Sequence, residues 1–567
     1  MEKRWVKKGV PSQDNIDTIS SSLNVNSTLA TLLAQRGICS FEDAKSFFRP
    51  SLDQLHDPFL MKDMEKGVNR LCEAIFGNEK ILIYGDYDVD GTTSVSLVFG
   101  FLKGFTENID YYIPDRYNEG YGISRMGVEW AGENGFSLII SLDCGIRAVE
   151  NTALANELGI DLIICDHHLP GDVLPGAYAI LDPKQADDNY PFKELSGCGV
   201  GFKLLQGFCI QNTIPIERLY GHLDLVAVSI ASDIVPIVGE NRTLAHYGLK
   251  KLNQSPSKGL ESLIEISGIK PPIGISDVVF YLGPRINAAG RLTHAKESVK
   301  LLLAESENDL MIFSDHLNAK NSERKKFDSS ITTEALDMIE SDDAIRQGKS
   351  TVLFKEDWHK GVIGIVASRC IESYYRPTII LTESKGMATG SARSVVGFDV
   401  HEAISACDDL LEQYGGHKYA AGLTLKLDNV GAFRKRFEEV VSATIDPELL
   451  IPQIEVDLEI GFDFIDFKSF GIINQMAPFG PQNLQPVFYS KEVKCKDEPR
   501  ILKDKHLKLT VYQESSSQTF DAIGFGLGHH GEKIKNAESF QIAYHIDENN
   551  FRGNKTLQLM IKDIKFD

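Results

Sequence analysis

The stretch Ile81-Leu82-Ile83-Tyr84-Gly85-Asp86-Tyr87-Asp88-Val89-Asp90-Gly91 joins a short apolar run directly to three closely spaced acids. An apolar run of this length, set between helix-like segments, predicts a buried strand of a parallel α/β sheet. Two further runs have the same form: residues 138–142 lead into Asp143, and residues 162–165 lead into Asp166-His167-His168. Ligands of such sheets bind outside the carboxyl ends of the strands. We therefore expect these carboxylates and imidazoles at one edge of one sheet.

Several acids gathered at one edge repel each other, and a pair of divalent metal ions is the usual remedy. Asp88 and Asp90 are one residue apart, so both can reach one metal centre if Gly91 permits a turn. Residues 92–94 are then expected to open a helix whose first amides suit a phosphate oxygen. A solvent-exposed turn is the alternative explanation of this motif. The fuller calcium-loop pattern, with a glutamate at its twelfth position, is absent.

The Asp166-His167-His168 triplet is less ordinary, because adjacent histidines after a buried strand are rarely needed for packing. Neutral imidazole is a good ligand for Mn, Fe or Zn, whereas carboxylates suit Mg and Mn. Asp143 alone could be an ordinary loop-capping residue. Taken together, the oxygen-rich set with a histidine predicts Mn²⁺ or Mg²⁺ rather than structural zinc, in a site for phosphate chemistry.

The bulk composition fits several soluble domains, with 567 residues and 43% hydrophobic content. A net charge of −21 argues against indiscriminate nucleic-acid binding over the whole surface, but it leaves room for a local basic channel. The nine cysteines are scattered without a CxxC pair, which favours reduced thiols in a cytoplasmic protein. We find no segment suited to a signal peptide or a membrane span, and no GxxxxGK[ST] loop, so no need for ATP is expected.

Five regions follow from the alternation of apolar, helical and polar segments. They are a helical N-terminal region at 1–75, a first α/β domain at 76–265, a connecting region with a long helix at 266–345, a second α/β domain at 346–447, and a barrel of short strands at 448–567. The strand-rich end of the chain suggests a small OB-type barrel.

Two segments between these strands carry local expectations. The long helix contains a basic cluster, which favours a solvated helix face; it comprises Lys320, Arg324, Lys325 and Lys326. In the second α/β domain, strands at 352–354 and 378–381 are separated by a helix at 362–374, and the glycine-rich stretch 415–422 is expected to precede a strand at 423–425.

The acidic motifs resemble those of a known superfamily. Asp88-Val89-Asp90, Asp143, Asp166-His167-His168 and the acid in Ile230-Ala231-Ser232-Asp233-Ile234 are similar, in order, to the four motifs of the DHH phosphoesterases. The segments 283–292, 390–394, 397–401 and 415–417 extend the resemblance to the RecJ-type single-strand-specific DNA exonucleases. The likeness spans essentially the whole chain. It implies an α/β fold with a parallel-sheet DHH domain, a long helix leading to a second α/β domain of DHHA1 type, and a C-terminal OB-like barrel.

The resemblance also implies roles for individual residues. The metal ligands would be Asp88, Asp90, Asp143, His167 and Asp233. Asp143 would bridge two ions, and the catalytic set would be His168, Asp143 and Asp166, with His168 facing the scissile phosphate. Contacts to nucleic acid or phosphate would come from Arg285, Asn287, Arg393 and His417.

Several of these assignments have alternatives within the sequence. Asp224 is a second acid close to the fourth motif, so it competes with Asp233. Tyr84 stands where many DHH proteins carry a metal-binding histidine, which would leave one ion with fewer protein ligands. Arg285 and Asn287 could simply brace a loop, and His417 could be a bystander beside a tight glycine turn.

The implied activity is hydrolysis of single-stranded DNA from its 5′ end to mononucleotides, with two Mn²⁺ or Mg²⁺ ions, in DNA repair and recombination. Implied partners are single-stranded DNA, a single-strand binding protein and a helicase, and a cytoplasmic monomer is expected. Barrel aromatics could stack on bases, although aromatics at strand positions are more often core; the candidates are Phe479, Phe488 and Tyr489.

Two other functions compete with the exonuclease. A DHH phosphatase for pyrophosphate, oligoribonucleotides or cyclic dinucleotides would explain the metal motifs, but not the N-terminal region or the barrel. A non-catalytic DNA-binding scaffold is the third hypothesis. Scaffold relatives lose the metal acids, whereas this chain retains all of them.

Overall fold

The computed structural model describes residues 2–566, without the side chain of residue 551. These residues form two compact units. The first unit combines Trp5–Gly283 with the chain from Ile454 onward, and the second extends from Pro284 to Gln453 together with the first few residues.

A parallel five-stranded sheet forms the centre of the first unit, in the order β3-β2-β4-β5-β6. Its strands are β2 (Ile81–Gly85), β3 (Ile109–Tyr112), β4 (Leu138–Leu142), β5 (Asp161–Cys165) and β6 (Ala179–Leu181). The first, third and fourth of these are the apolar runs of the sequence, and every residue of β2 and β4 is buried. Burial on both faces explains why these strands read as continuous rather than alternating apolar runs.

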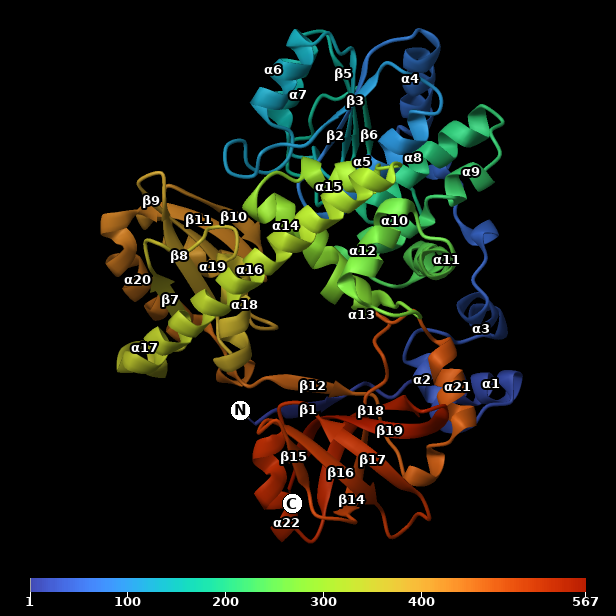
Figure 1. The fold of residues 1–567 in the computed structure, drawn as a ribbon, viewed down its shortest axis with the longest axis vertical. Helices are drawn as coiled ribbons and strands as arrows, with labels where there is room; N and C mark the ends of the chain where they lie inside the picture. Colours follow the sequence, from blue (N-terminus) through green and yellow to red (C-terminus); the bar gives the residue numbers. More distant parts are fainter. Residues whose placement is uncertain (1, 567) are drawn as a thin grey trace. The chain divides into compact units, whose positions relative to one another are not determined.

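Helices cover both faces of this sheet (Figure 1). One layer contains α6 (Arg125–Glu133) and α7 (Val149–Glu157), and the other contains α4 (Met64–Phe76) and α8 (Gly197–Gln211). Against α8 pack α5 (Val89–Leu102) and α10 (Leu223–Ser232), and α11 (Gly239–Gln254) packs on α10. The predicted α/β layers of this region are therefore confirmed.

The N-terminal region is largely helical, with α1 (Gln13–Leu23), α2 (Ser27–Ala34) and α3 (Phe41–Phe48). It also contains one strand that the sequence did not predict, β1 (Arg4–Lys7), which pairs with β12 (Gln453–Val456). Buried residues of α1 and α2 share a single core with the C-terminal barrel. Three short helices bury too little apolar surface alone, so they fold onto a distant part of the chain.

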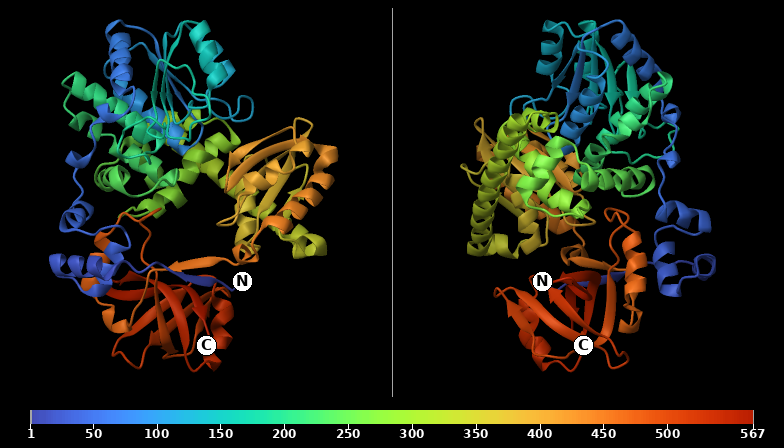
Figure 2. Two further views of the ribbon diagram at one scale, coloured as in Figure 1. Left: turned by 180° about the vertical axis from the view of Figure 1, so that it is seen from behind. Right: turned by 45° about the vertical axis from the view of Figure 1, so that its right-hand side comes forward.

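The C-terminal strands form a sheet in the order β13-β14-β18-β19-β17-β16-β15, and an additional β14–β16 pairing curls it toward closure (Figure 2). Its main strands are β14 (Phe488–Cys495), β16 (His506–Tyr512), β17 (Thr519–Gly524), β18 (Phe540–Phe551) and β19 (Asn554–Lys565). The expected barrel is confirmed. Phe488 and Tyr489 are 1% and 4% exposed, so they belong to its core rather than to a base-stacking surface.

The second unit contains a mixed sheet in the order β10-β11-β9-β8-β7. Its strands are β7 (Thr351–Phe354), β8 (Thr378–Ser384), β9 (Met387–Arg393), β10 (Gln413–His417) and β11 (Ala420–Lys426), with α18 (Ile363–Ser373) between the first two. The strand expected at 423–425 is confirmed as part of β11, and the glycine-rich stretch before it forms a hairpin of β10 and β11. Gly416 has φ +142° and leaves no room for a Cβ beside Ala420 and Ala421, so glycine there admits the close strand rather than a loop.

The long helix is α16 (Glu307–Ser341), and α17 (Asp343–Gln347) follows where the Asp342 side chain caps two backbone amides. The expectation of a solvated basic cluster on α16 is wrong for Arg324, which is 9% exposed and donates to Asn321. Lys320 pairs with Glu323 on the surface, as a solvated face predicts.

Two chain-wide features complete the fold. Among residues 2–566, no helix combines the length and the apolar character that crossing a membrane requires. All nine cysteines are free thiols, and seven of them are buried.

Candidate metal centre

The predicted acids and histidines meet at the carboxyl edge of the parallel sheet. Gly85 of β2 pairs with Leu142 of β4, and Leu142 pairs with Cys165 of β5, so the residues that follow these strands are direct neighbours. Three overlapping groups have ligand atoms within 4.8 Å of one another: Asp143–His167–His168, Asp90–His167–Asp233 and Asp86–Asp88–Asp143.

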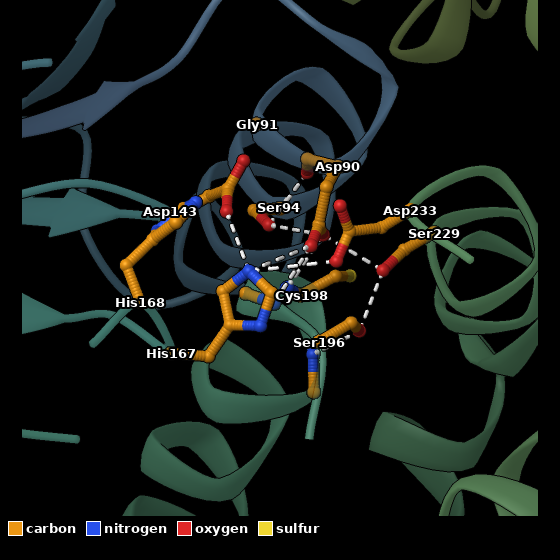
Figure 3. A network of polar contacts seen from close by, with 12 residues as sticks. Asp90, Gly91, Ser94, Asp143, His167, His168, Ser196, Cys198, Ser229 and Asp233 are labelled. Carbon is orange, nitrogen blue, oxygen red and sulfur yellow. Dashed lines mark hydrogen bonds and ion pairs between the residues drawn. The ribbon is translucent and has the colours of Figure 1, made fainter. Parts of the chain in front are cut away.

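His167 lies among the carboxylates of Asp90, Asp143 and Asp233 (Figure 3). Its Nε2 is 3.1 Å from Oδ1 of Asp143, 3.5 Å from Oδ2 of Asp233 and 3.8 Å from Oδ2 of Asp90. One imidazole nitrogen and three carboxylate oxygens from four different chain segments thus converge on one point. This donor set is the kind that Mn²⁺ accepts.

Asp90 is held from three sides. Its carboxylate accepts hydrogen bonds from the N–H groups of Gly197 and Cys198 at 2.7 and 2.8 Å, and from the Ser229 hydroxyl at 2.7 Å. The two amides belong to the N-terminus of α8, where the helix dipole favours negative charge. A Cβ on Gly197 would lie 2.5 Å from Cβ of Asp143, so only glycine lets α8 approach the site this closely.

The second cluster joins Asp143 to Asp86 and Asp88. Asp143 adopts φ +60°, a left-handed conformation that Asp tolerates, and it directly follows β4. Asp88 caps α5 by accepting from the N–H of Gly91 at 3.0 Å. Oδ1 of Asp86 is buried without a hydrogen-bond partner in the described part of the chain. Asp143 is common to two of the three clusters, which suits a bridging ligand.

Two local expectations about this segment are wrong. Gly91 lies inside the first turn of α5 rather than at a turn before it, and glycine is needed because a Cβ would lie 2.4 Å from the carbonyl oxygen of Asp86. The helix begins at Val89, so residues 92–94 do not open it. Their hydroxyls bond to main-chain carbonyls one turn earlier, as with Thr93 Oγ1 to the Val89 oxygen at 2.7 Å.

Burial and mutual repulsion raise the pKa values of the clustered acids. Burial, with neighbouring carboxylates, holds the pKa of Asp143, Asp86 and Asp88 above its usual range. The same causes raise the pKa of Asp233 to about 8. Burial lowers the pKa of His167 to about 4, which leaves its imidazole neutral and able to act as a ligand. Buried acids around a neutral imidazole lack a compensating cation, so these residues fit a divalent metal ion.

His168 differs from its neighbour in charge and surroundings. Its Nδ1 is 2.7 Å from Oδ1 of Asp166, and although burial opposes it, this bond raises the pKa of His168 to about 9. The same bond, with the N–H of Ile146 on the other oxygen at 2.9 Å, overcomes burial and lowers the pKa of Asp166 to about 2. The His168 side chain is 32% exposed, and the Tyr121 hydroxyl lies 3.2 Å from its ring. The pair places an imidazolium beside the cluster.

The structure separates the two candidate acids of the fourth motif. Asp233 ends α10 and joins Asp90 and His167, whereas Asp224 accepts from the N–H of Ser257 at 2.6 Å and faces Lys251 at 3.8 Å. Tyr84 contributes no ligand atom to the three clusters. Its hydroxyl is buried and accepts from the N–H of Ser124 at 3.0 Å.

The predicted phosphate-binding residues all belong to the second unit. Arg285 and Asn287 lie on α14 (Gly283–Leu292), where Arg285 is 7% exposed and donates to Asn318 of α16 at 3.1 Å. Arg393 ends β9 and donates to Oγ of Ser391 at 3.0 Å. Arg393 and His417 both pair with Ala420 of β11, so they stand in one row across three adjacent strands.

Three residues at the metal edge were not assigned from the sequence. Asp86 lies in the same acidic run as Asp88, so its type and place were a usable signal. Ser229 precedes Asp233 by one helical turn, which puts both side chains on one face of α10. Tyr121 carries no signal in the sequence, because only the fold brings it to His168.

The fold and this site define a DHH-type protein with further domains. The DHH family, N-terminal domain, matches residues 80–230, the DHHA1 domain matches residues 347–443, and the RecJ OB domain matches residues 456–563. These matches, and curated RecJ relatives that are 33–40% identical over nearly the whole chain, show that the chain belongs to the RecJ family.

Curated relatives cover nearly the whole chain. The single-stranded-DNA-specific exonuclease RecJ of Bacillus subtilis is 40% identical over 562 residues, which are 98% of this chain and 70% of that protein. The enzyme of the same name from Escherichia coli is 33% identical over 94% of this chain and 95% of that protein. Among solved structures, RecJ of Thermus thermophilus in complex with Mn²⁺ is 25% identical, covers 99% of this chain and 79% of that chain, and has a TM-score of 0.85.

Proposed function

We propose that this chain is a metal-dependent exonuclease that hydrolyses single-stranded DNA from its 5′ end to mononucleotides, using two Mn²⁺ or Mg²⁺ ions and no ATP. Membership of the RecJ family supports this activity, and both relatives above are named single-stranded-DNA-specific exonucleases. The observation that carries the proposal is the convergence of Asp90, Asp143 and Asp233 on the neutral His167. Roles in DNA repair and recombination follow from the same membership.

The proposed ligands are those of the sequence prediction, Asp88, Asp90, Asp143, His167 and Asp233, and Asp86 is added by its place in the second cluster. When bound, the ion pair supplies charge neutralisation and an acidified water. Asp143 belongs to two of the three groups and would link the two metal positions. Ser229 and the α8 amides fix both oxygens of Asp90, so its carboxylate does not need to reorient.

His168 would act on the phosphate rather than as a ligand. Its imidazolium charge, maintained by Asp166, stabilises negative charge that develops on a non-bridging phosphate oxygen. Asp166 has both oxygens occupied by hydrogen bonds, so it orients His168 and does not itself reach substrate. We therefore propose Asp166 as a positioning residue rather than a catalytic one.

Arg285, Asn287, Arg393 and His417 are proposed contacts to the DNA backbone. The row that joins Arg393 to His417 spans two strand spacings, or about 10 Å. Two cationic or polar side chains in one row on a sheet suit contacts to the phosphates of an extended strand. Arg285 and Asn318 brace each other, which holds the guanidinium in one orientation.

The free, mostly buried thiols support a cytoplasmic location. A helicase would supply the unwound strand, and a single-strand binding protein would keep it single-stranded. The five-part division of the chain also remains our proposal. Light scattering after size-exclusion chromatography tests the expected monomer.

Degradation of oligonucleotides labelled at either end tests the activity. With Mn²⁺, the wild type should release labelled mononucleotide at once from a 5′ label, and only late from a 3′ label. EDTA and Asp143→Ala should each abolish release. Hydrolysis of pyrophosphate or dinucleotides without degradation of DNA would instead assign the chain to the small-substrate phosphatases, and DNA binding without any turnover would indicate a scaffold.

A further inference from the structure

The loop that follows Asp233 is held in an unusual conformation. Asp233 ends α10, where its N–H donates to the Ser229 oxygen at 2.9 Å. The next residue, Ile234, has φ +61°, although its side chain is β-branched and 63% exposed. Such a residue is a genuine outlier, and it persists only where the surroundings determine it. Because the Ile234 side chain is mostly in solvent, its own packing cannot be what holds the loop.

The far end of this loop is fixed by the barrel region. The N–H of Ile237 donates to the Pro481 oxygen at 2.8 Å, and the Ile237 side chain is fully buried. A Cβ on Gly480 would lie 2.5 Å from Cγ1 of Ile237, so the segment 476–484 presses directly on Ile237. Reciprocal main-chain hydrogen bonds between Gly480 and Asn483, of 3.1 and 2.9 Å, close that segment into a turn.

Arg242 clamps the same segment to the catalytic domain. Its guanidinium donates to the carbonyl oxygens of Met476 at 2.9 Å, Ala477 at 3.0 Å and Pro478 at 3.4 Å. It also donates twice to the oxygen of Phe47, whose ring lies 3.8 Å from the guanidinium carbon. All five N–H groups of Arg242 are therefore used by main-chain carbonyls.

This arrangement argues against an anion site. A cavity of about 400 Å³ lies beside Arg36 and Arg242, and two buried arginines could suggest a phosphate pocket. However, Arg242 has no N–H left to donate, and Arg36 donates to Leu32, Asn483 and Leu484. The N–H groups of both arginines therefore hold the segment 476–484 and its neighbours in place and are not free for an anion.

We propose that the segment 476–484 is a positioning element of the metal centre: by pressing on Ile237 through Gly480, and being held by Arg242, it sets the position of Asp233. Gly480 and Arg242 are then positioning residues for metal binding, although neither lies at the metal edge. The inference rests on the proposed function in one respect, namely that Asp233 is a metal ligand.

Direct Mn²⁺ titration of the full chain, followed by the electron paramagnetic resonance signal of free Mn²⁺, tests the proposal without any nuclease assay. Gly480→Ala should weaken Mn²⁺ binding about 10-fold, the lower end of the effect of residues that orient ligands. Gly471→Ala is the matched control, because it lies on α21 (Phe467–Gln475) with open space around its Cβ position, and it should bind as the wild type does.

A rescue distinguishes positioning from general damage. Ile237→Ala removes the two atoms that a Cβ on residue 480 would meet first. The nearest remaining atom is then Cβ of residue 237, at 3.6 Å, which is an ordinary contact. Gly480→Ala combined with Ile237→Ala should therefore bind Mn²⁺ within about 3-fold of Ile237→Ala alone, as coupled residues do. Arg242→Lys keeps the charge but loses the planar fork, and it should also weaken Mn²⁺ binding.

The outcomes separate this inference from the proposed function. Wild-type Mn²⁺ affinity in folded Gly480→Ala, or in folded Arg242→Lys should the first variant not fold, would overturn the positioning role alone. A wild-type chain that binds no Mn²⁺ would overturn both.

Discussion

In the parallel sheet, the proposed functional side chains follow the ends of strands, whereas in the mixed sheet they lie across the strands. β2, β4 and β5 each end in acids or histidines, and parallel order brings those ends together. In the other sheet, Arg393 and His417 come from β9 and β10 and meet through their shared partner on β11. The first arrangement concentrates negative charge at one point, and the second spreads donors along a line. A metal ion needs the former, and an extended phosphate backbone needs the latter.

The largest effect on hydrolysis is expected from removing the charge of Asp143, the carboxylate that two groups of the metal edge share. Asp143→Asn keeps the shape of the side chain but removes a charge from both clusters, so the hydrolysis rate should fall more than about 100-fold, beyond the range for residues that only orient ligands. Single-turnover hydrolysis of 5′-labelled DNA with Mn²⁺ measures this. Asp172→Asn, an exposed acid of the same domain, is the control and should change nothing. Equal rates for the two variants would contradict the proposed metal edge.

A smaller effect is expected from the charge beside the metal edge. Asp166→Asn removes the anion that holds His168 as an imidazolium, so kcat should fall about 10- to 100-fold, as for other orienting partners. KM for DNA should stay within about 2-fold, because the ground-state contacts of the second unit are untouched. Steady-state kinetics on one oligonucleotide separate the two parameters. A rise in KM with unchanged kcat would show that His168 binds substrate without acting on the reaction.

The sheet-face residues should respond in the opposite way. Arg393→Gln should raise KM about 10-fold with kcat nearly unchanged, since a hydrogen bond to a charged group contributes about 1.5–3 kcal/mol. The slope of log affinity against log salt should fall by about 0.7, the value for one phosphate contact on a single strand. Arg369→Gln, at an exposed position of α18 where Arg369 pairs with Glu372, is the control. Loss of kcat in Arg393→Gln would place Arg393 in the chemistry instead.

Metal removal should distinguish the two units by stability. At 100 times its dissociation constant, Mn²⁺ should add about 2.7 kcal/mol to the unit that binds it. That unit should therefore unfold about 2–4 °C higher with Mn²⁺ than with EDTA. Calorimetry of the full chain follows both transitions, and the second unit provides the internal control. If only the transition of the second unit shifted, the metal would bind in that unit and not at the parallel sheet.

The strands that carry the metal edge could be predicted because each is buried on both faces. Burial makes residues 81–85 and 138–142 read as unbroken apolar runs, and the polar residues then mark where the strands end. The hairpin of β10 and β11 could not be predicted in this way. Its glycines gave no strand signal, since the close approach of Gly416 to Ala421 exists only once the strands pair.

Much of the site was therefore determined by the sequence alone: the identity of the acids, the two histidines and their order along parallel strands. Only the tertiary structure shows that Asp233, and not Asp224, lies beside His167, since both are in or beside the same helix and packing alone sets which one faces the imidazole. Likewise, the capture of Asp90 by α8 and Ser229, and of Ile237 by Gly480 and Pro481, joins residues more than 100 positions apart. The local sequence pattern predicts strands and helices, because these depend on residues that are neighbours in the chain. Contacts between distant segments depend on how whole elements pack, and no local pattern records them.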